Sequence, residues 1–217
     1  MACLRNPQRS SEKRTTSSIR RCDAAWMTGF QMLDNRHILL GVTGGVAAYK
    51  AVDLAGKLTG AGAEVKTVMT EAACRFIAPK SLEAVTQSTV YTSMWSTPDE
   101  CNVGHIALAD WADVVVVAPA TANIFAKVAH GICDDLLSTT LCACWAKPTI
   151  FAPAMNTRMW ENPAVQANVE TLIERGVHLV GPEEGRLACG SHGLGRMSEP
   201  REIMDAIEKI ASNIKEA

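Results

Sequence analysis

From His37 onward, short apolar runs alternate with longer amphipathic segments along almost the whole chain. The apolar runs are typical of buried strands and lie at residues 37–43, 64–70, 112–120, 148–154 and 177–182. Helices are predicted for the amphipathic segments at residues 46–62, 71–87, 121–131, 134–146, 161–175 and 200–215. Strands that alternate with helices at this spacing form a parallel sheet, because each crossover must return along one face. The pattern therefore predicts a single-domain α/β fold with a doubly wound, Rossmann-like or flavodoxin-like parallel sheet and helices on both faces.

The first 36 residues differ in composition from the rest of the chain. Their segment LRNPQRSSEKRTTSSIRR is rich in Arg, Ser and Thr and has almost no hydrophobic periodicity, which predicts disorder. A transit peptide can have this composition, but a flexible tail, or a misassigned start with Met32 as the true first residue, explains it as well. We expect a disordered extension over residues 1–36 and one folded domain over residues 37–217.

The charge and hydrophobicity of the chain indicate which kind of molecule it binds. The 217 residues carry a net charge of −2, which gives no basic field for nucleic acid. No window approaches the roughly 20 apolar residues of a membrane-spanning helix. Eight cysteines at irregular spacings, without a recognisable secretory signal, predict reduced thiols in a cytoplasmic protein and no metal site. We therefore expect a small-molecule partner, no nucleic acid and no membrane.

Ligands of doubly wound sheets bind beyond the carboxyl ends of the strands, so the loops there hold the candidate site residues. The turn TGGVAAYK places Gly44 and Gly45 before a helix start, where free N–H groups and the helix dipole suit a phosphate. The dinucleotide spacing GxGxxG is absent, which favours a mononucleotide such as FMN, although such a turn can also be merely a tight connection. Thr70, Thr121 and Asn123 follow neighbouring strands and could contact the same ligand or cap the following helices.

His105 and His192 are the two of the five histidines that lie in candidate site loops, although a lone histidine near a helix start is more often structural. Cys189 lies in RLACGSHGLGRM, a long glycine-rich connection that is typical of a mobile lid. An exposed thiol there could react, with its pKa lowered by Arg186, His192 or Arg196. The alternative is an incidental surface thiol.

The stretch FAPAMNTRMW ends a predicted strand with residues that a core strand does not need. Pro153 and Asn156 would stop the strand at the carboxyl edge of the sheet, and Asn156 offers an amide donor and acceptor to a ligand. Met155, Met159 and Trp160 would form an adaptable apolar wall. A helix cap with ordinary core packing would explain Asn156 but not the whole cluster.

Four of these segments, in this order, resemble motifs of the homo-oligomeric flavin-containing cysteine decarboxylases. The resemblance runs from about residue 37 to residue 215. The family's PxMNxxMW signature is present as PAMNTRMW, its flavin-phosphate turn as TGGVAAYK, its active histidine as His105 and its ACG lid as LACG. Many bacterial relatives have Asp after ACG, where this chain has Ser191.

The resemblance implies a cofactor, a reaction and an assembly. FMN would be bound by Gly44, Gly45, Val46, Thr70, Thr121, Asn123 and Ala154. The catalytic residues would be His105, Asn156 and Cys189, and the substrate would contact Asn156, Met159 and Cys189. The reaction would be the FMN-dependent decarboxylation of phosphopantothenoylcysteine to phosphopantetheine in coenzyme A biosynthesis. A homotrimer, or a multiple of trimers, would form each site between subunits.

Three alternatives remain open from the sequence. A peptidyl-cysteine decarboxylase performs only the oxidative half of the reaction and releases an enethiol; the LACG lid argues against it. A flavin prenyltransferase would not require His105 together with PAMNTRMW. A flavoprotein regulatory or binding subunit of this fold usually has an acidic tail, whereas this chain ends in IASNIKEA.

Overall fold

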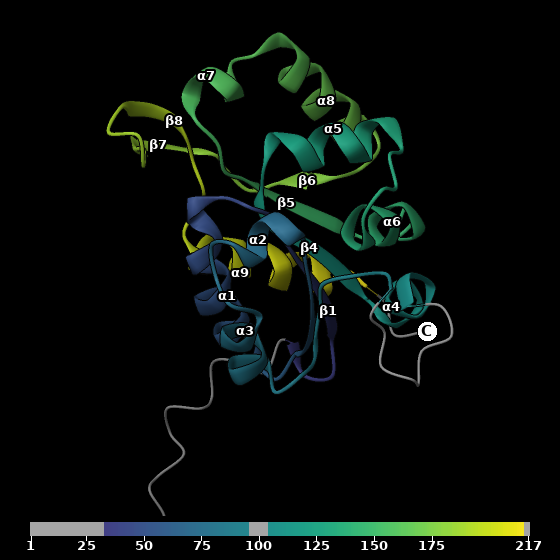
Figure 1. Ribbon diagram of the computed structural model, residues 1–217. Coiled ribbons are helices and arrows are strands. Elements are labelled where there is room, and N and C mark those ends of the chain that lie inside the picture. The colour runs from purple at the N-terminus through teal and green to yellow at the C-terminus, as the bar shows by residue number, and fades with distance from the viewer. Residues whose placement is uncertain (1–32, 96–103, 215–217) are drawn as a thin grey trace, which may run out of the picture.

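The computed structural model describes residues 33–95 and 104–214. Within them, a six-stranded sheet has the order β3-β2-β1-β4-β5-β6, and every neighbouring pair is parallel (Figure 1). The strands are β1 (His37–Val42), β2 (Glu64–Met69), β3 (Val90–Tyr91), β4 (Val114–Ala120), β5 (Thr149–Pro153) and β6 (His178–Leu179). The order reverses between β1 and β4, as in the Rossmann type of doubly wound sheet. The predicted fold class is confirmed.

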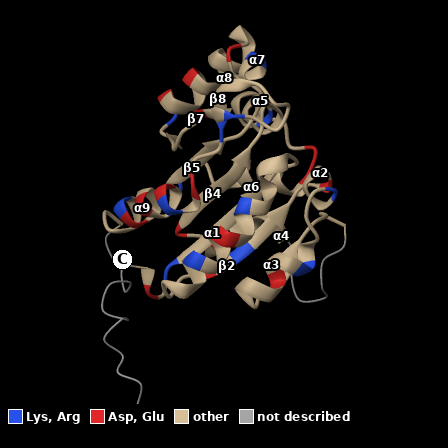
Figure 2. Cartoon of the chain, turned by 90° about the vertical axis from the view of Figure 1, so that its left-hand side faces the viewer, with Lys and Arg blue, Asp and Glu red and all other residues tan. Residues whose placement is uncertain are grey.

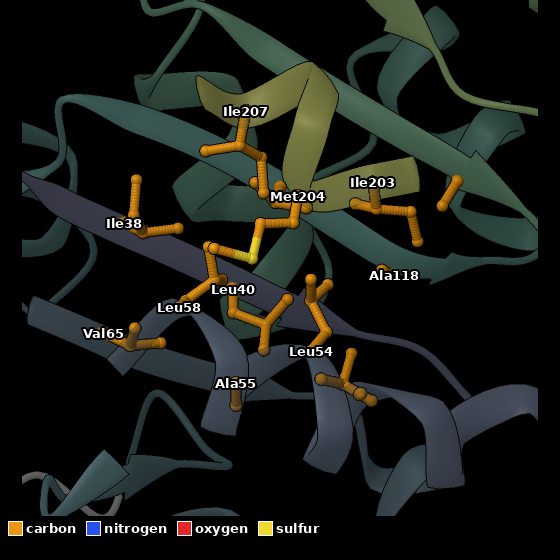
Figure 3. Packing of buried hydrophobic residues seen from close by; sticks show 14 of the residues in the cluster. Ile38, Leu40, Leu54, Ala55, Leu58, Val65, Ala118, Ile203, Met204 and Ile207 are labelled. Carbon is orange, nitrogen blue, oxygen red and sulfur yellow. The ribbon is translucent and has the colours of Figure 1, made fainter. Parts of the chain in front are cut away.

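One face of the sheet is covered by α1 (Tyr49–Gly60), α3 (Pro79–Thr86) and α9 (Pro200–Ala211). Ile38 and Leu40 of β1 point to this face, because alternate side chains of a strand point the same way. Figure 3 shows these two residues packed with side chains of α1 and α9, among them Leu54, Leu58, Met204 and Ile207. The exposed side of α9 carries both acidic and basic residues (Figure 2). This helix is therefore amphipathic, as its sequence pattern predicts.

The opposite face is covered by α4 (Gly104–Trp111), α5 (Ala122–His130), α6 (Leu136–Ala143) and α8 (Pro163–Glu174). Leu39 points to this side, and Phe125 of α5 meets Phe151 of β5 edge to face, with 5.2 Å between ring centroids. Both faces of the strands are thus buried. Strands buried on both faces are continuous apolar runs rather than alternating ones, which is why the sequence shows runs such as VVVVAPA.

Several element boundaries differ from those predicted. The first helix is preceded by a 3-10 turn, η3 (Val46–Ala48), and the helix predicted over 71–87 is divided into α2 (Glu71–Cys74) and α3. The break falls before Pro79, because the residue that precedes a proline is pushed out of the helical conformation; Ala78 is accordingly extended. The two-residue strand β3 and the one-turn helix α7 (Thr157–Trp160) are too short to give a periodic signal.

The glycine-rich connection predicted as a loop is an antiparallel hairpin of β7 (Glu183–Arg186) and β8 (His192–Arg196), so that prediction is wrong. Two glycines of β8 let it lie directly on the start of α7. A Cβ at Gly195 would be 2.2 Å from the Met155 carbonyl oxygen, and one at Gly193 would be 2.6 Å from Thr157 Oγ1. At the same close approach, the Met155 N–H donates a hydrogen bond to the Gly195 carbonyl at 3.0 Å. The glycines therefore serve close packing as well as flexibility.

Most of the extension predicted to be disordered, residues 1–32, lies outside the described residues. Leu33 is fully buried in the core, and the Arg36 carbonyl accepts a hydrogen bond from the Glu64 N–H. The folded part thus includes residues that precede His37. Cys3, Cys22 and Cys101 also lie outside the described residues, and the described cysteines are free thiols. Within residues 33–95 and 104–214, no helix combines the length and apolarity needed to cross a membrane.

Candidate functional site

A cavity of about 490 Å³ lies at the carboxyl edge of the sheet, between the ends of β1, β2 and β4. This is the topological switch point, where ligands of such sheets bind, and the volume suits a small molecule. Four predicted cofactor residues, Gly44, Thr70, Thr121 and Asn123, line it together. The other lining residues are Thr43, Glu71, Ala72, Arg75, Ile124, Lys127 and Asp135.

Two threonines join the ends of β1 and β4 beside this cavity. Thr43 is buried; its hydroxyl donates to the Pro119 carbonyl at 2.8 Å, accepts from the Thr121 N–H at 3.2 Å and lies 3.1 Å from Thr121 Oγ1. Among the described residues, the Thr121 hydroxyl thus contacts Thr43 and does not cap α5. The capping alternative is wrong for Thr121. Thr43 opens the predicted phosphate turn TGGVAAYK, but its contact with Thr121 was not predicted, although two threonines ending neighbouring strands were a usable signal.

The Gly44 turn is shaped by the close approach of α2. A Cβ at Gly44 would lie 2.5 Å from Ala72 Cβ and 2.8 Å from the Ala72 carbonyl carbon. Gly45 is extended and precedes η3, in which the Ala48 N–H donates to the Gly45 carbonyl at 2.9 Å. The N–H groups that open a helix, ahead of this bond, have no partner within the helix itself. Thr70 accepts a hydrogen bond from the Ala73 N–H at 3.2 Å, so the capping alternative is correct for Thr70. The turn offers backbone donors to an anion.

Both cations that line the cavity are paired with carboxylates. Lys127 Nζ lies 2.6 Å from both Asp134 Oδ1 and Asp135 Oδ2, and Arg75 binds Glu71. Burial alone would lower the pKa of Lys127, but the hydrogen bonds to the two carboxylates outweigh it and raise the pKa. An anion in the cavity would therefore be held by N–H groups and hydroxyls. The sequence analysis did not predict Lys127 as a site residue. The only pattern that could have indicated it is the pair of consecutive aspartates, Asp134 and Asp135, in the loop that follows α5.

Asn156 and Cys189, 33 residues apart, are in direct contact. Asn156 precedes α7 and caps it, with its Oδ1 accepting from the Arg158 N–H at 2.9 Å. Its Nδ2 donates to Cys189 Sγ at 3.1 Å. Cys189 is exposed in the turn between β7 and β8, and the Ser191 hydroxyl lies 3.0 Å from the same sulfur. Helix capping and a place in the candidate site are therefore both true of Asn156.

Neutral donors control the acidity of Cys189. The pKa of its thiol is lowered mainly by the hydrogen bond from the Ser191 side chain and then by the Ser191 N–H; burial opposes this, and the Asn156 amide adds to it. Two of the predicted cations are paired elsewhere. Arg196 lies 2.6 Å from Glu183, and His192 lies 3.7 Å from Glu184. The prediction that nearby cations lower this pKa is therefore wrong.

The remaining predicted residues lie at different depths. The Ala154 N–H donates to the Ala120 carbonyl at 2.9 Å, which ties the end of β5 to β4. Met155 and Trp160 pack against the core cluster under α5 and α8, whereas Met159 is 47% exposed. Of the predicted apolar wall, only Met159 thus presents a largely free surface.

His105 stands apart from these groups. It is half-buried near the start of α4, which packs beside α6. In both Figure 1 and Figure 2, α4 lies far from α7 and from the β7–β8 hairpin. Within the described part of one chain, the helix that carries His105 is therefore remote from the elements that carry Asn156 and Cys189.

Comparisons with known proteins agree with this geometry. Residues 29–212 match the family model Flavoprotein. The chain is 49% identical over 178 residues to the coenzyme A biosynthesis bifunctional protein CoaBC of Bacillus subtilis, which covers 82% of this chain and 44% of that protein. The chain thus spans less than half the length of this curated relative.

Two solved structures are similar over almost their whole length. One is a PPC decarboxylase mutant complexed with pantothenoylaminoethenethiol, with a TM-score of 0.76 and 38% identity, covering 82% of this chain and 100% of that one. The other is the FMN binding protein AtHal3, with a TM-score of 0.73 and 37% identity, covering 84% of this chain and 100% of that one.

Proposed function

The chain belongs to the Flavoprotein family, and we propose that it binds FMN and decarboxylates phosphopantothenoylcysteine to phosphopantetheine, a step of coenzyme A biosynthesis in the cytoplasm. The observation that carries the proposal is the hydrogen bond from Asn156 Nδ2 to Cys189 Sγ. It brings the PAMNTRMW and LACG motifs into one site. A solved relative with 38% identity over its full length is named a PPC decarboxylase, which supports this substrate.

The cavity at the switch point fits FMN. The absence of a Cβ at Gly44 lets the turn lie directly against α2, the turn precedes a helix start whose N–H groups suit a phosphate, and Thr70 and Thr121 line the same cavity. We propose that FMN is held by Gly44, Gly45, Val46, Thr70, Thr121, Asn123 and Ala154. Bound FMN would supply the acceptor that takes a hydride from the cysteinyl CH2–SH group and later returns it.

The chemistry explains the need for a polar site with an acid. A carboxylate leaves readily only when its bonding electrons have an acceptor, and oxidation of CH2–SH to a thioaldehyde provides one. Loss of carbon dioxide then yields an enethiolate. Asn156 would hold the substrate carboxylate and amide, with Met159 beside them, and His105 would act as a base or orient the cysteinyl group. Cys189 would donate its proton to the carbon that lost carbon dioxide, which restores the thioaldehyde for reduction, and would be left as a thiolate.

We further propose a homotrimer, or a multiple of trimers, in which a second copy supplies His105. The separation of α4 from α7 and the hairpin within one chain supports this assembly (Figure 1). A site that needs both His105 and Asn156 is incomplete without a neighbouring copy. The oligomer would thus be required for activity and not only for stability.

One assay tests the function. Purified protein should release FMN, and not FAD, on denaturation, and should evolve carbon dioxide from phosphopantothenoylcysteine with phosphopantetheine as the product by mass spectrometry. Turnover of a peptide with a C-terminal cysteine, but not of this substrate, would establish the peptidyl-cysteine alternative. Bound FMN with no decarboxylation of either would establish a binding subunit.

A further inference from the structure

Ser191 lies at the end of the turn that joins β7 and β8, two residues after Cys189. The turn is closed by backbone hydrogen bonds from the Leu187 N–H to the Ser191 carbonyl at 2.8 Å and from the Gly190 N–H to the Leu187 carbonyl at 2.9 Å. Gly190 has a φ of +87°, a left-handed conformation that favours glycine. The backbone thus sets where Ser191 stands relative to the thiol, and its hydroxyl oxygen is 3.0 Å from Cys189 Sγ.

We propose that Ser191 is a positioning residue that donates a hydrogen bond to Cys189 Sγ and stabilises the thiolate left when this cysteine gives up its proton. The role rests on the proposed function, in which Cys189 is the proton donor. The Ser191 hydroxyl at 3.0 Å and the Asn156 amide at 3.1 Å both contact the same sulfur, so two side-chain donors converge on it. A hydroxyl can also accept a hydrogen bond from the protonated thiol. Ser191 and Cys189 therefore remain hydrogen-bonded both before and after the proton is transferred.

The chemistry favours a neutral donor at this position. When the S–H bond breaks, its proton passes to the substrate carbon and its electron pair stays on sulfur as negative charge. Donors already oriented toward that sulfur stabilise the charge without rearrangement. The lowered pKa of the Cys189 thiol, with Ser191 as its largest cause, agrees with this effect. A carboxylate at position 191 would instead place a like charge beside the sulfur and oppose thiolate formation.

Thiol alkylation tests the hydrogen bond without substrate or turnover. Iodoacetamide reacts with the thiolate, so the rate of Cys189 modification against pH, followed by peptide mass spectrometry, reports its acidity. We expect Ser191→Ala to slow this reaction at pH 7 by roughly two- to tenfold, the effect of losing one hydrogen bond. Ser191→Asp should slow it further, and Ser191→Thr, which keeps a hydroxyl, should restore the wild-type profile. The exposed thiols of Cys133 and Cys142 are internal controls whose profiles should not move.

A second arm links the hydrogen bond to catalysis. With phosphopantothenoylcysteine, Ser191→Ala should release a larger share of enethiol product than the wild type, whereas Ser212→Ala, an exposed serine at the end of α9, should not. An unchanged alkylation profile in Ser191→Ala overturns the proposal. A shifted alkylation profile with an unchanged ratio of enethiol to phosphopantetheine also overturns it, because the acidity of Cys189 would then have no effect on the reaction. If the wild type does not decarboxylate, the proposed function fails, while alkylation alone still decides the hydrogen bond.

Discussion

The switch-point cavity and the Asn156–Cys189 site are built in different ways. The cavity is formed by the ends of core strands, and its bridging residue Thr43 is 3% exposed. The Asn156–Cys189 site is formed by an exposed hairpin that lies on a one-turn helix. A change in the cavity must therefore disturb buried backbone, whereas a change at the hairpin can alter chemistry and leave the core intact. We expect cofactor binding to depend on folding, and proton transfer to be separable from it.

The largest expected effect is loss of turnover when a residue of the substrate site is changed. Asn156→Asp removes an amide donor and adds a negative charge beside the substrate carboxylate, and His105→Asn removes an ionisable ring. Each should lower kcat roughly 10²–10⁴-fold while FMN stays bound, measured by flavin absorbance after gel filtration.

The same two variants test whether the site is shared between copies. Neither should be active alone, but mixed and reassembled oligomers should regain part of the wild-type activity, because some interfaces then combine an intact His105 with an intact Asn156. Mixing two preparations of the same variant is the matched control. Failure of the mixture to regain activity, with exchange of subunits shown by mass, would place both residues in one chain.

The next effect is a change of product in Cys189→Ser. Oxidation and loss of carbon dioxide do not use the thiol, so carbon dioxide should still be released in a first turnover. A serine hydroxyl is a far weaker acid than a cysteine, whose free pKa is about 8.5, so the enethiol should accumulate. Mass spectrometry should find a product two hydrogens lighter than phosphopantetheine. Formation of phosphopantetheine at the wild-type rate would show that Cys189 is an incidental thiol.

A smaller effect is expected from Gly44→Ala in the cavity. The new Cβ would meet the backbone of Ala72, which cannot move without shifting α2. Such overpacking costs roughly 1–3 kcal/mol of unfolding free energy and should weaken FMN retention together with stability. The matched control is Gly56→Ala in α1, where a Cβ meets nothing within 4 Å. Equal melting temperatures for Gly44→Ala and the wild type would contradict the predicted coupling of cofactor binding to folding.

The smallest effect concerns a carboxyl pair at the base of the hairpin. The pKa of Glu183 is lowered to about 2, first by the hydrogen bond with Glu202 and also by Arg196, while the pKa of Glu202 is raised by Glu183. The contribution of Glu183 to stability is thus complete above its ordinary value of 4.5 and is lost as pH falls toward 2. Ionised Glu202 acts in the opposite sense, because its raised pKa means that its ionisation costs stability as pH rises.

Glu202→Gln tests this pair. Glutamine removes the like charge at pH 7 and can still accept from the Glu199 N–H at the start of α9. We expect the melting temperature of Glu202→Gln to be slightly higher than that of the wild type at pH 7. The difference should shrink at acid pH, where Glu202 of the wild type becomes protonated and is then uncharged like glutamine. Glu170→Gln, on the exposed side of α8, is the control. A lower melting temperature for Glu202→Gln at pH 7 would contradict the conclusion that ionised Glu202 costs stability.

The amino-acid sequence by itself determined the doubly wound sheet and the edge at which to look for a site. Apolar runs and helical periodicity are local properties, and in a parallel sheet the carboxyl ends of all strands meet at one edge. Gly44, Thr70, Thr121 and Asn123 could therefore be grouped without coordinates, and the structure places them around one cavity.

Contacts between distant segments were decided only by the tertiary structure. The Thr43–Thr121 bridge, the pairing of Lys127 with two aspartates and the donation from Ser191 and Asn156 to Cys189 depend on distances that no pattern encodes. The hairpin was mistaken for a loop because its glycines, which usually signal flexibility, here allow β8 to touch α7. The same holds for His105: its motif predicts a site residue, but α4, which carries it, lies far from α7 in the same chain (Figure 1).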